Sequence, residues 1–333
     1  MTYFDFLRPP PPFDPSAPAY KDWLHLNIID HTSRSVVLVN TSLHGPPDDP
    51  RSRAVGAALV HVADIGWLGN LEVIGLPEAA LGVSNIGLRN VGLSVDPLAA
   101  NVSASVRDGH GAFDLRADAS PDCRPILVEQ HLPLGRGWIS WYAVPRLNVS
   151  GTWTVGGMTR TLTGASAYHD HNWGRWHWGD DFGWEWACFL APQPGPCFVL
   201  SRTTDRAHLH CGPPSLTLCM GDLHRTFRGP AVRLEYADRL EQPVRRLPGA
   251  LAALHQDRAQ PRLPGRLEVR VDDGIDRFAI SFQPRAAAQL VAADPIVRGY
   301  GFIHELPGEF VCSGRVGAAS IDALGLGVLE HVD

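Results

Sequence analysis

One segment, AYHDHNWGRWHWGDDFGWEWACF at 167–189, gathers the side chains that are best suited to chemistry. It holds five of the ten tryptophans, together with three histidines, three aspartates and one glutamate. A carboxylic acid enclosed by indole rings would be shielded from water, and burial disfavours its anion. Such an acid can give a proton to an electron-rich alkene, and the ring faces can stabilise the resulting carbocation by roughly 0.5–2 kcal/mol each. The segment therefore predicts acid catalysis on an unsaturated, apolar molecule.

Alternation within this segment indicates which carboxyl group would act. If TLTGASAYHDHN is a strand, Tyr168, Asp170 and Asn172 share one face, and His169 and His171 share the other. We predict that Asp170 is the general acid and that Tyr168 orients it by hydrogen bonding. The expected lining of the site is Asn172, Trp23, Trp141, Trp173, Trp184 and Trp186. The alternative is a buried polar network that only stabilises the sheet.

Metal binding is a competing interpretation of the same histidines. His169 and His171 would lie about 6.6 Å apart along a strand, close enough to share an ion. Two clusters have ligand-type side chains: His169, His171, His177, Asp180 and Asp181, and the HLHC run at 208–211 with Cys219. However, the sequence has no H-x-x-x-H, H-E-x-x-H or paired C-x-x-C motif, so we predict no metal. Other polar residues among apolar neighbours, such as His25, His304 and His331, are expected to be structural.

Motifs of other enzyme classes are missing as well. There is no G-x-S-x-G, which disfavours nucleophilic catalysis of the hydrolase type. Gly151, Gly156 and Gly157 fall in a predicted hairpin and do not form a phosphate or dinucleotide loop. An enzyme that depends on NAD or ATP is therefore disfavoured.

The elements that must position these residues are strands. Short alternating runs such as LHLNIID, SVVLVNTSL and RLEVRV recur between turn residues, and the chain has 33 Gly and 28 Pro. This pattern predicts an antiparallel all-β fold, with short helices only at 247–256 and 284–290. We expect a proline-rich arm at 1–20, an N-terminal domain at 21–135 and a C-terminal domain at 136–333. The boundary is placed at LPLGRG, and 238–264 is interpreted as an insertion.

Composition sets further bounds. The chain has 333 residues, 44% of them hydrophobic, so it can form a packed core. Its net charge of -6, without a basic patch, argues against nucleic acid as a partner. No apolar run reaches the roughly eighteen residues of a membrane span. The six cysteines lack C-x-x-C spacing and are expected to be buried free thiols.

The first residues, MTYFDFLRPPPPF, lack the basic and apolar regions of a secretory signal, so a cytoplasmic location is expected. Six prolines at 8–18 predict an extended arm outside the core. Phe4, Phe6 and Leu7 could dock on a membrane surface, but a tail without contacts is the preferred interpretation.

The stretch WYAVPRLNVSGTWTVGGMTRTLTGASAYHDHNWG, followed by WGDDFGWEWACF, resembles the lipocalin-like family of bacterial carotenoid 1,2-hydratases (hydroxyneurosporene hydratases). The specific part is Y-x-D-H-N-W-G, and the terminal GLGVLEHV is similar to the closing strand of the family. Lipocalin-like Diels–Alderases share this architecture. The resemblance implies two consecutive lipocalin-like β-barrels, no organic cofactor, and roles for Tyr168 and Asp170 in protonating a terminal double bond.

Together these features predict an enzyme that acts on a hydrophobic small molecule without a cofactor. The leading hypothesis is hydration of a terminal alkene in a long polyene or isoprenoid. The first alternative is an intramolecular cyclase, such as a Diels–Alderase, whose cavity folds and orients a linear polyketide-derived polyene. The second alternative is a carrier of apolar ligands that catalyses nothing.

Overall fold

The computed structural model describes residues 5–11, 13–96, 101–107, 113–247, 261–297 and 299–333. The fold is nearly all β, with 69% strand and 3% helix, and its two curled sheets are of the lipocalin-like type, as expected. The chain forms two compact units. Unit 1 comprises Met1–Asp180 and Ala293–Tyr300, and unit 2 comprises Asp181–Ala292 and Gly301–Asp333.

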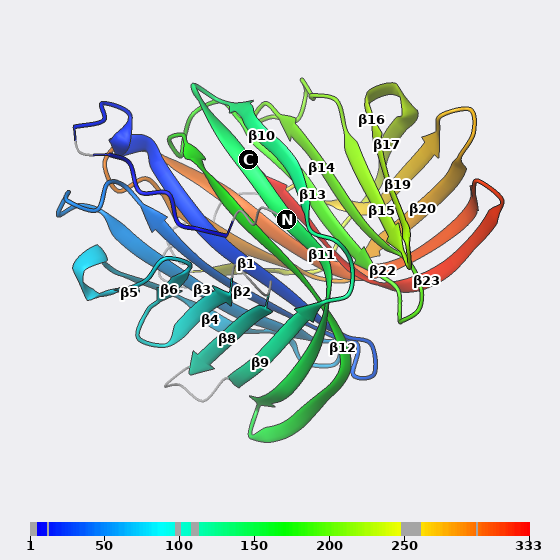
Figure 1. The fold of residues 1–333 in the computed structure, drawn as a ribbon, viewed down its shortest axis with the longest axis horizontal. Coiled ribbons are helices and arrows are strands. Elements are labelled where there is room, and N and C mark those ends of the chain that lie inside the picture. The colour runs from blue at the N-terminus through cyan, green and yellow to red at the C-terminus, as the bar shows by residue number, and fades with distance from the viewer. Residues whose placement is uncertain (1–4, 12, 97–100, 108–112, 248–260, 298) are drawn as a thin grey trace. The chain divides into compact units, whose positions relative to one another are not determined.

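Unit 1 contains a twelve-stranded sheet in the order β4-β3-β2-β1-β12-β11-β9-β8-β7-β6-β5, with β10 paired to β11 (Figure 1). Its elements are η1 (Ala17–Ala19), β1 (Tyr20–Asp30), β2 (Ser35–His44), β3 (Arg53–Val62), β4 (Gly66–Gly75), η2 (Leu76–Glu78), β5 (Ala80–Leu81), β6 (Asn85–Gly87), β7 (Val91–Asp96), β8 (Asn101–Arg107), β9 (Phe113–Pro121), β10 (Ile126–Leu134), β11 (Gly137–Val155) and β12 (Met158–Arg175). Strand β1 connects the β2–β4 part of this order to the long strand β12, because it pairs with both β2 and β12.

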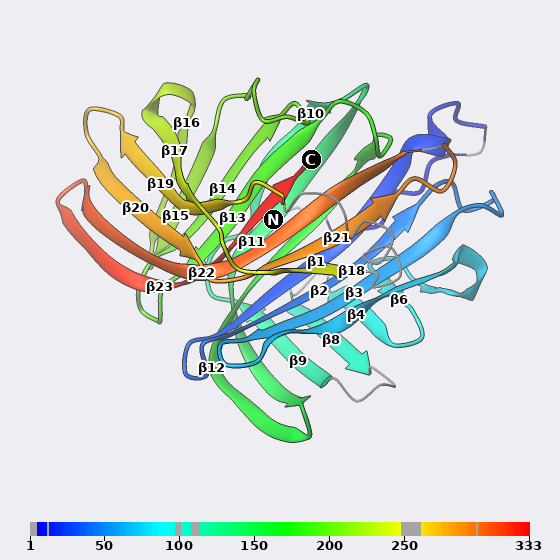
Figure 2. The same cartoon turned by 180° about the vertical axis from the view of Figure 1, so that it is seen from behind.

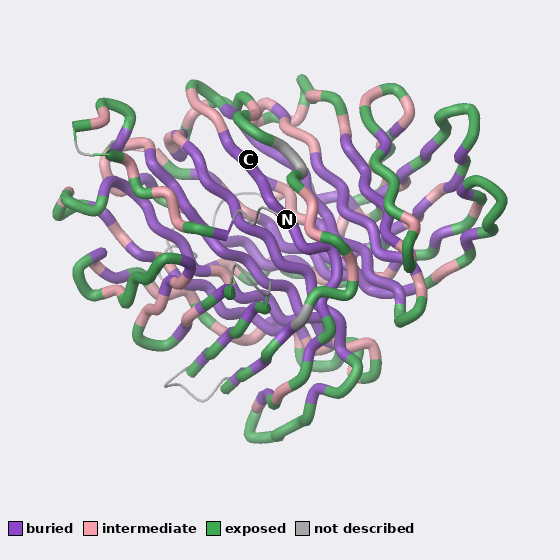
Figure 3. The backbone as a smooth tube through the Cα atoms, in the orientation of Figure 1, coloured by how far each residue is buried: buried purple, intermediate pink, exposed green. Residues whose placement is uncertain are grey.

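The long strand β12 changes its environment along its length. Its first residues, near the turn that joins it to β11, are mostly exposed, whereas its second half is buried on both faces (Figure 3). One buried face contributes Ala165, Ala167 and Trp173 to the hydrophobic core of unit 1. The other face carries Tyr168 and Asp170, which are not part of that core. The segment with the predicted chemistry is thus the fully buried end of a strand.

Unit 2 contains an eleven-stranded sheet in the order β16-β15-β14-β13-β23-β22-β20-β19-β17. Strand β21 pairs with β22 and, in parallel, with β18 (Figure 2). Its elements are β13 (Gly183–Leu190), β14 (Cys197–Thr204), β15 (Ser215–Met220), β16 (Leu223–Arg228), η3 (Gly229–Ala231), β17 (Val232–Arg239), β18 (Val244–Leu247), β19 (Pro264–Asp272), β20 (Arg277–Pro284), β21 (Ala287–Ala293), β22 (Tyr300–Val316) and β23 (Ala319–Val332). A second hydrophobic core, rich in phenylalanine, is formed by residues of this unit.

The division between the units differs from the expected boundary at 135–136. Strand β11 begins at Gly137 and pairs with β9 and β12, so both long strands belong to unit 1, which continues to Asp180. The LPLGRG motif is only the turn between β10 and β11. Unit 1 also includes Ala293–Tyr300, between β21 and β22, and there the buried Asp294 pairs with the buried Lys21 of the same unit at 3.3 Å.

The N-terminal segment is not the free arm that its prolines predicted. Asp5 is fully buried, and Leu7 packs against the core of unit 1. The backbone N–H of Leu7 also donates to the carbonyl of Val83 at 2.9 Å. Of the proposed membrane-docking residues, Phe6 is exposed, Leu7 is packed and Phe4 lies outside the described residues.

The prediction of a helix at 284–290 is wrong, because this segment contains the end of β20 at Pro284 and the start of β21 at Ala287. Its apolar residues are buried in the sheet, where tertiary pairing outweighs helical propensity. The other expected helix, at 247–256, lies outside the described residues except for Leu247, which ends β18. In the expected insertion at 238–264, the described residues include β18, the end of β17 and the start of β19.

None of the described helices is long and apolar enough to cross a membrane.

Candidate functional site

Asp170 is held by three hydrogen-bond donors. Its Oδ2 accepts a hydrogen bond from the Tyr168 hydroxyl at 2.8 Å and another from Nε1 of Trp141 at 3.2 Å. Its Oδ1 accepts a hydrogen bond from Nδ2 of Asn172 at 2.6 Å. Only 3% of Asp170 is exposed, and Tyr168 is fully buried. The carboxyl group is therefore dry and fixed in orientation.

Sheet pairing explains why these side chains meet. Tyr168, Asp170 and Asn172 alternate along β12 and so share a face, as predicted. Trp141 on β11 stands directly opposite Asn172, and Trp23 on β1 stands opposite Asn172 from the other side. Directly opposed residues on antiparallel strands share a face. Four predicted lining or catalytic positions therefore surround Asp170.

His25 is a member of this face to which the sequence analysis gave only a structural role. It is the cross-strand partner of Asp170 on β1 and is buried. Burial, helped by the charge of His169, lowers its pKa to about 3, so the ring is neutral. His25 therefore adds a neutral, polar ring to the surroundings of the acid without competing for its proton.

Two further tryptophans extend the indole surface. The ring of Trp176 packs edge-on to Trp23 at 5.2 Å, and Trp178 packs edge-on to Trp176 at 6.3 Å. Both lie in the loop after β12, and both are buried. Gly174 makes room for this loop, because a Cβ there would lie 2.9 Å from Cζ3 of Trp176. The sequence analysis identified the loop but not its contact with β1, which only the sheet order reveals.

Trp173 lies on the opposite face of β12 from Asp170. It belongs to the core of unit 1, and the guanidinium of Arg8 lies 3.9 Å from the centroid of its ring. The same alternation that joins Tyr168 to Asp170 separates Trp173 from them. Trp173 therefore does not line the surface that carries the carboxyl group.

Trp184 and Trp186 belong to unit 2. They share the face of β13 that is opposite to the core residues Ala187 and Phe189, and both are buried. Nε1 of Trp184 donates to Oε1 of Glu330 at 2.5 Å. Burial raises the pKa of Glu330, although hydrogen bonds from Trp184 and Glu305 oppose this effect. Unit 2 thus has an acid of its own beside an indole.

The histidines of β12 point into unit 1 and bind carboxylates of the chain. His169 directs Nδ1 at the carbonyl of His25, 2.8 Å away, and Nε2 at Asp5, 3.1 Å away. Nε2 of His171 lies 2.7 Å from Oδ1 of Asp22. The first proposed metal cluster is divided among separate partners, since His177 pairs with Asp294 and Asp180 pairs with Arg136.

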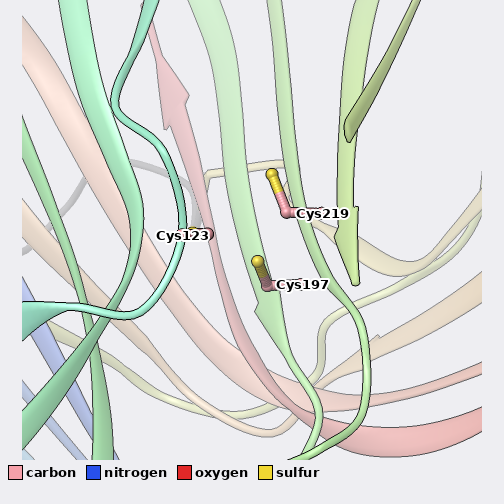
Figure 4. Close-up of side chains that lie close together, drawn as sticks. All are labelled: Cys123, Cys197 and Cys219. Atoms are coloured by element: carbon pink, nitrogen blue, oxygen red, sulfur yellow. The ribbon is translucent and has the colours of Figure 1, made fainter. Parts of the chain in front are cut away.

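Four of the six cysteines are buried free thiols, as expected: Cys188, Cys197, Cys219 and Cys312. Cys123 is partly buried, and Cys211 is exposed. Cys197 and Cys219 occupy opposed positions on the neighbouring strands β14 and β15 (Figure 4). The residues of the second cluster lie in different surroundings, because Cys219 is buried in the sheet whereas His210 and Cys211 are exposed in a loop.

No protein-family model and no curated protein matches this sequence. Solved structures do match its fold. A putative AttH from Nitrosomonas europaea superposes with a TM-score of 0.67 and 13% identity over 98% of this chain and 99% of its own. Kievitone hydratase from Nectria haematococca superposes with a TM-score of 0.62 and 13% identity, over 100% of this chain and 95% of its own. CghA with Sch210972 superposes with a TM-score of 0.63 and 13% identity, over 95% of this chain and 89% of its own. At this identity, the three structures show a shared fold.

Proposed function

We propose that this chain is a cofactor-independent hydratase that adds water to a terminal alkene of a long hydrophobic polyene or isoprenoid. The observation that carries the proposal is the buried Asp170 carboxyl group with its three donors, Tyr168, Trp141 and Asn172. Kievitone hydratase, whose fold this chain shares, is a hydratase by name, and this agrees with the proposal.

The proposed reaction begins with transfer of the Asp170 proton to an alkene carbon. The alkene π electrons form the new C–H bond, and the neighbouring carbon becomes a carbocation. The reaction requires the protonated form of Asp170, and the three donors stabilise the carboxylate that remains after the transfer. Water then adds to the cation and returns a proton to Asp170, so the net change is the addition of one water molecule.

The indole rings have a defined part in this reaction. Trp23 and Trp141 stand on the Asp170 face, and a cation over such a ring is stabilised by roughly 0.5–2 kcal/mol. A carotenoid with an unconjugated terminal alkene has the extended, apolar form that suits these surroundings, and is the substrate class we infer.

A second candidate, intramolecular cyclisation of a linear polyene, is favoured by Trp176. Its Nε1 is buried, and no hydrogen-bond partner for it exists among the described residues. A buried donor that lacks an acceptor is costly, by about 1–3 kcal/mol, and a substrate carbonyl would satisfy it. A polarised carbonyl activates an attached alkene for cycloaddition, in which Asp170 would transfer no proton.

Solvent deuterium distinguishes the candidates. The purified protein is incubated in D2O with an acyclic carotenoid and, separately, with a linear polyene that carries a diene and an activated alkene. A hydratase forms a water adduct with one deuterium on carbon, and Asp170→Asn should lower that rate by at least about 100-fold. A cyclase forms an isomer without deuterium on carbon and largely retains activity in the same variant.

The matched control is Asp114→Asn, which removes an exposed carboxylate from β9 of the same sheet and should leave turnover unchanged. Binding of both polyenes without product would indicate a carrier and contradict the proposal. Circular dichroism of each variant shows whether a lost activity reflects a lost fold.

A further inference from the structure

Unit 2 contains a cluster of ligand-type side chains that the proposed function does not use. Glu185, His208 and His331 line a cavity of about 510 Å³, and one ligand atom from each lies within 4.8 Å of the others. Glu185 comes from β13, His208 from the loop after β14 and His331 from β23. In a zinc site the metal lies about 2.0–2.2 Å from nitrogen and carboxylate oxygen ligands, so small side-chain shifts would close the set around an ion.

His208 has the orientation of a metal ligand. Its Nε2 lies 2.9 Å from the carbonyl oxygen of Val332, which requires a hydrogen on Nε2. In a neutral ring this leaves a lone pair on Nδ1, which lies 3.0 Å from Oε1 of Glu185. Two lone pairs at that distance repel each other unless a proton or a cation lies between them. Metal-binding histidines commonly donate their other N–H to a backbone carbonyl in this way.

Glu185 is held so that one oxygen remains available. Its Oε2 accepts a hydrogen bond from Nε of Arg202 at 2.6 Å, while Oε1 faces His208. The Arg202 guanidinium also forms an ion pair with this carboxylate at 2.6 Å. The pairing with Arg202 fits a carboxylate anion, and the oxygen bound by Arg202 is anchored as in many metal sites.

His331 supplies the third ligand, which is the second nitrogen of the set. Its Nδ1 is buried, and the described residues provide no hydrogen-bond partner for it. A nitrogen in this position can present a lone pair to an ion. The ring stacks on His208 with a centroid distance of 3.7 Å and an interplanar angle of 19°. Since imidazole binds metals in the ring plane, coordination requires the two rings to tilt apart.

From this geometry we infer that Glu185, His208 and His331 bind a divalent transition-metal ion of the zinc type, with a coordination position open to the cavity. Two histidines and one carboxylate are the protein ligands of one established class of zinc site, in which a water occupies the remaining position. Arg239 and Arg262 also line the cavity, which favours an anionic ligand beside the metal. This inference does not depend on the proposed hydratase activity, because it concerns other residues in another unit.

The test is metal binding by the full chain after removal of metals with a chelator. Zn2+ is titrated by calorimetry, and Co2+ is used as a spectroscopic probe because tetrahedral Co2+ absorbs strongly in visible light. We expect one Zn2+ for each chain and a shift of the His208 and His331 ring proton resonances as the stack opens. His331→Phe keeps the stacked ring but removes the ligand, and Glu185→Gln removes the charge; each should weaken binding by more than about 100-fold.

The control is His210→Ala, which removes an exposed histidine of the same loop and should leave the affinity unchanged. A second control, Cys197→Ser with Cys219→Ser, measures binding to thiols. If wild-type protein takes up no Zn2+, or if His331→Phe and Glu185→Gln bind it as well as wild type does, the inference is wrong. In that case His208 is an imidazolium that pairs with Glu185. His331→Phe should retain the stack and the fold, so its loss of binding cannot be attributed to unfolding.

Discussion

The hydroxyl of Tyr168 donates a hydrogen bond of 2.8 Å to Asp170, two residues further along the same strand. Alternate residues of a strand share a face, so the pairing depends only on β12 remaining extended. The neighbouring strands then add Trp141 and Trp23 to the same face. The acid is thus held mainly by its own strand, and the surrounding rings come from sheet pairing.

Replacing Tyr168 by phenylalanine tests this relationship. The variant keeps the ring and removes one donor to Asp170, and a hydrogen bond to a charged group contributes about 1.5–3 kcal/mol. We expect water addition to an acyclic carotenoid to slow by roughly 10–100-fold, because the carboxylate left by proton transfer is less stabilised. Product formation is measured by mass spectrometry, with Tyr300→Phe at an exposed position as the control. An unchanged rate would remove Tyr168 from the mechanism.

Asp5 should control the stability of unit 1 although it lies in the N-terminal segment. It pairs with His169 at 3.1 Å, and both side chains are fully buried. Removing one partner of a buried ion pair typically costs about 3–5 kcal/mol, and we expect a loss of this size in the free energy of unfolding of Asp5→Asn. Urea denaturation measures it. Asp48→Asn, an exposed change in the loop between β2 and β3 of the same unit, should have little effect.

The same pair predicts a pH dependence. Burial lowers the pKa of His169, but the charge and hydrogen bond of Asp5 outweigh it, so the folded pKa lies above the ordinary value of 6.5. The stabilisation is therefore complete below pH 6.5 and is lost as the pH rises through the folded pKa. The difference in unfolding free energy between wild type and Asp5→Asn should shrink at alkaline pH. A difference that grows with pH would refute this assignment.

Gly174 should be intolerant of a side chain. A Cβ at this position would lie 2.2 Å from the carbonyl oxygen of Trp138 and 2.9 Å from Cζ3 of Trp176. We expect Gly174→Ala to lower the free energy of unfolding by about 1–3 kcal/mol and to displace Trp176, which intrinsic fluorescence would report. Gly92→Ala in β7 of the same sheet meets its nearest atom only at 3.5 Å and serves as the control. Equal effects of the two substitutions would contradict this account.

Local patterns in the sequence predicted what local geometry determines. Period-two alternation identified the all-β fold and placed Tyr168, Asp170 and Asn172 on one face, because a strand fixes both. Trp173 was included in the lining even though the same alternation placed it on the other face. Pairing between distant strands could not be inferred in this way, so the contacts of Trp176 with β1 were missed.

Composition predicted the placement of a segment less well where one buried contact determines that placement. The prolines at 8–18 predicted an arm outside the core, but the buried Asp5 pairs with a histidine that is distant in sequence. The boundary at LPLGRG was misplaced because a hairpin turn and a domain linker have the same turn residues. The sequence analysis did not bring Glu185, His208 and His331 together, because they are far apart in the sequence. Pairing of β13 with β23 sets Glu185 opposite His331, and the loop after β14 adds His208.

Stability should fall in mild acid because several histidines are buried in the neutral form. Burial, followed by the charge of Lys21, lowers the pKa of His44 to about 3, and His25 and His331 have similar values. The unfolded chain binds protons below pH 6.5 and the folded chain does not, so stability is lost as the pH falls from that value toward 3. At pH 5.5 each such histidine lowers the free energy of unfolding by about 1.4 kcal/mol.

Replacing His44 by glutamine should therefore remove about 1.4 kcal/mol from the change in unfolding free energy between pH 7.5 and pH 5.5. Urea denaturation at both pH values measures this change, and the slope with pH is the readout because the substitution itself also alters stability. Val39→Ala removes buried volume from the same strand without removing a titratable group, so it should lower stability equally at both pH values. If His44→Gln keeps the full pH dependence of the wild type, His44 is not a neutral buried ring in the folded chain.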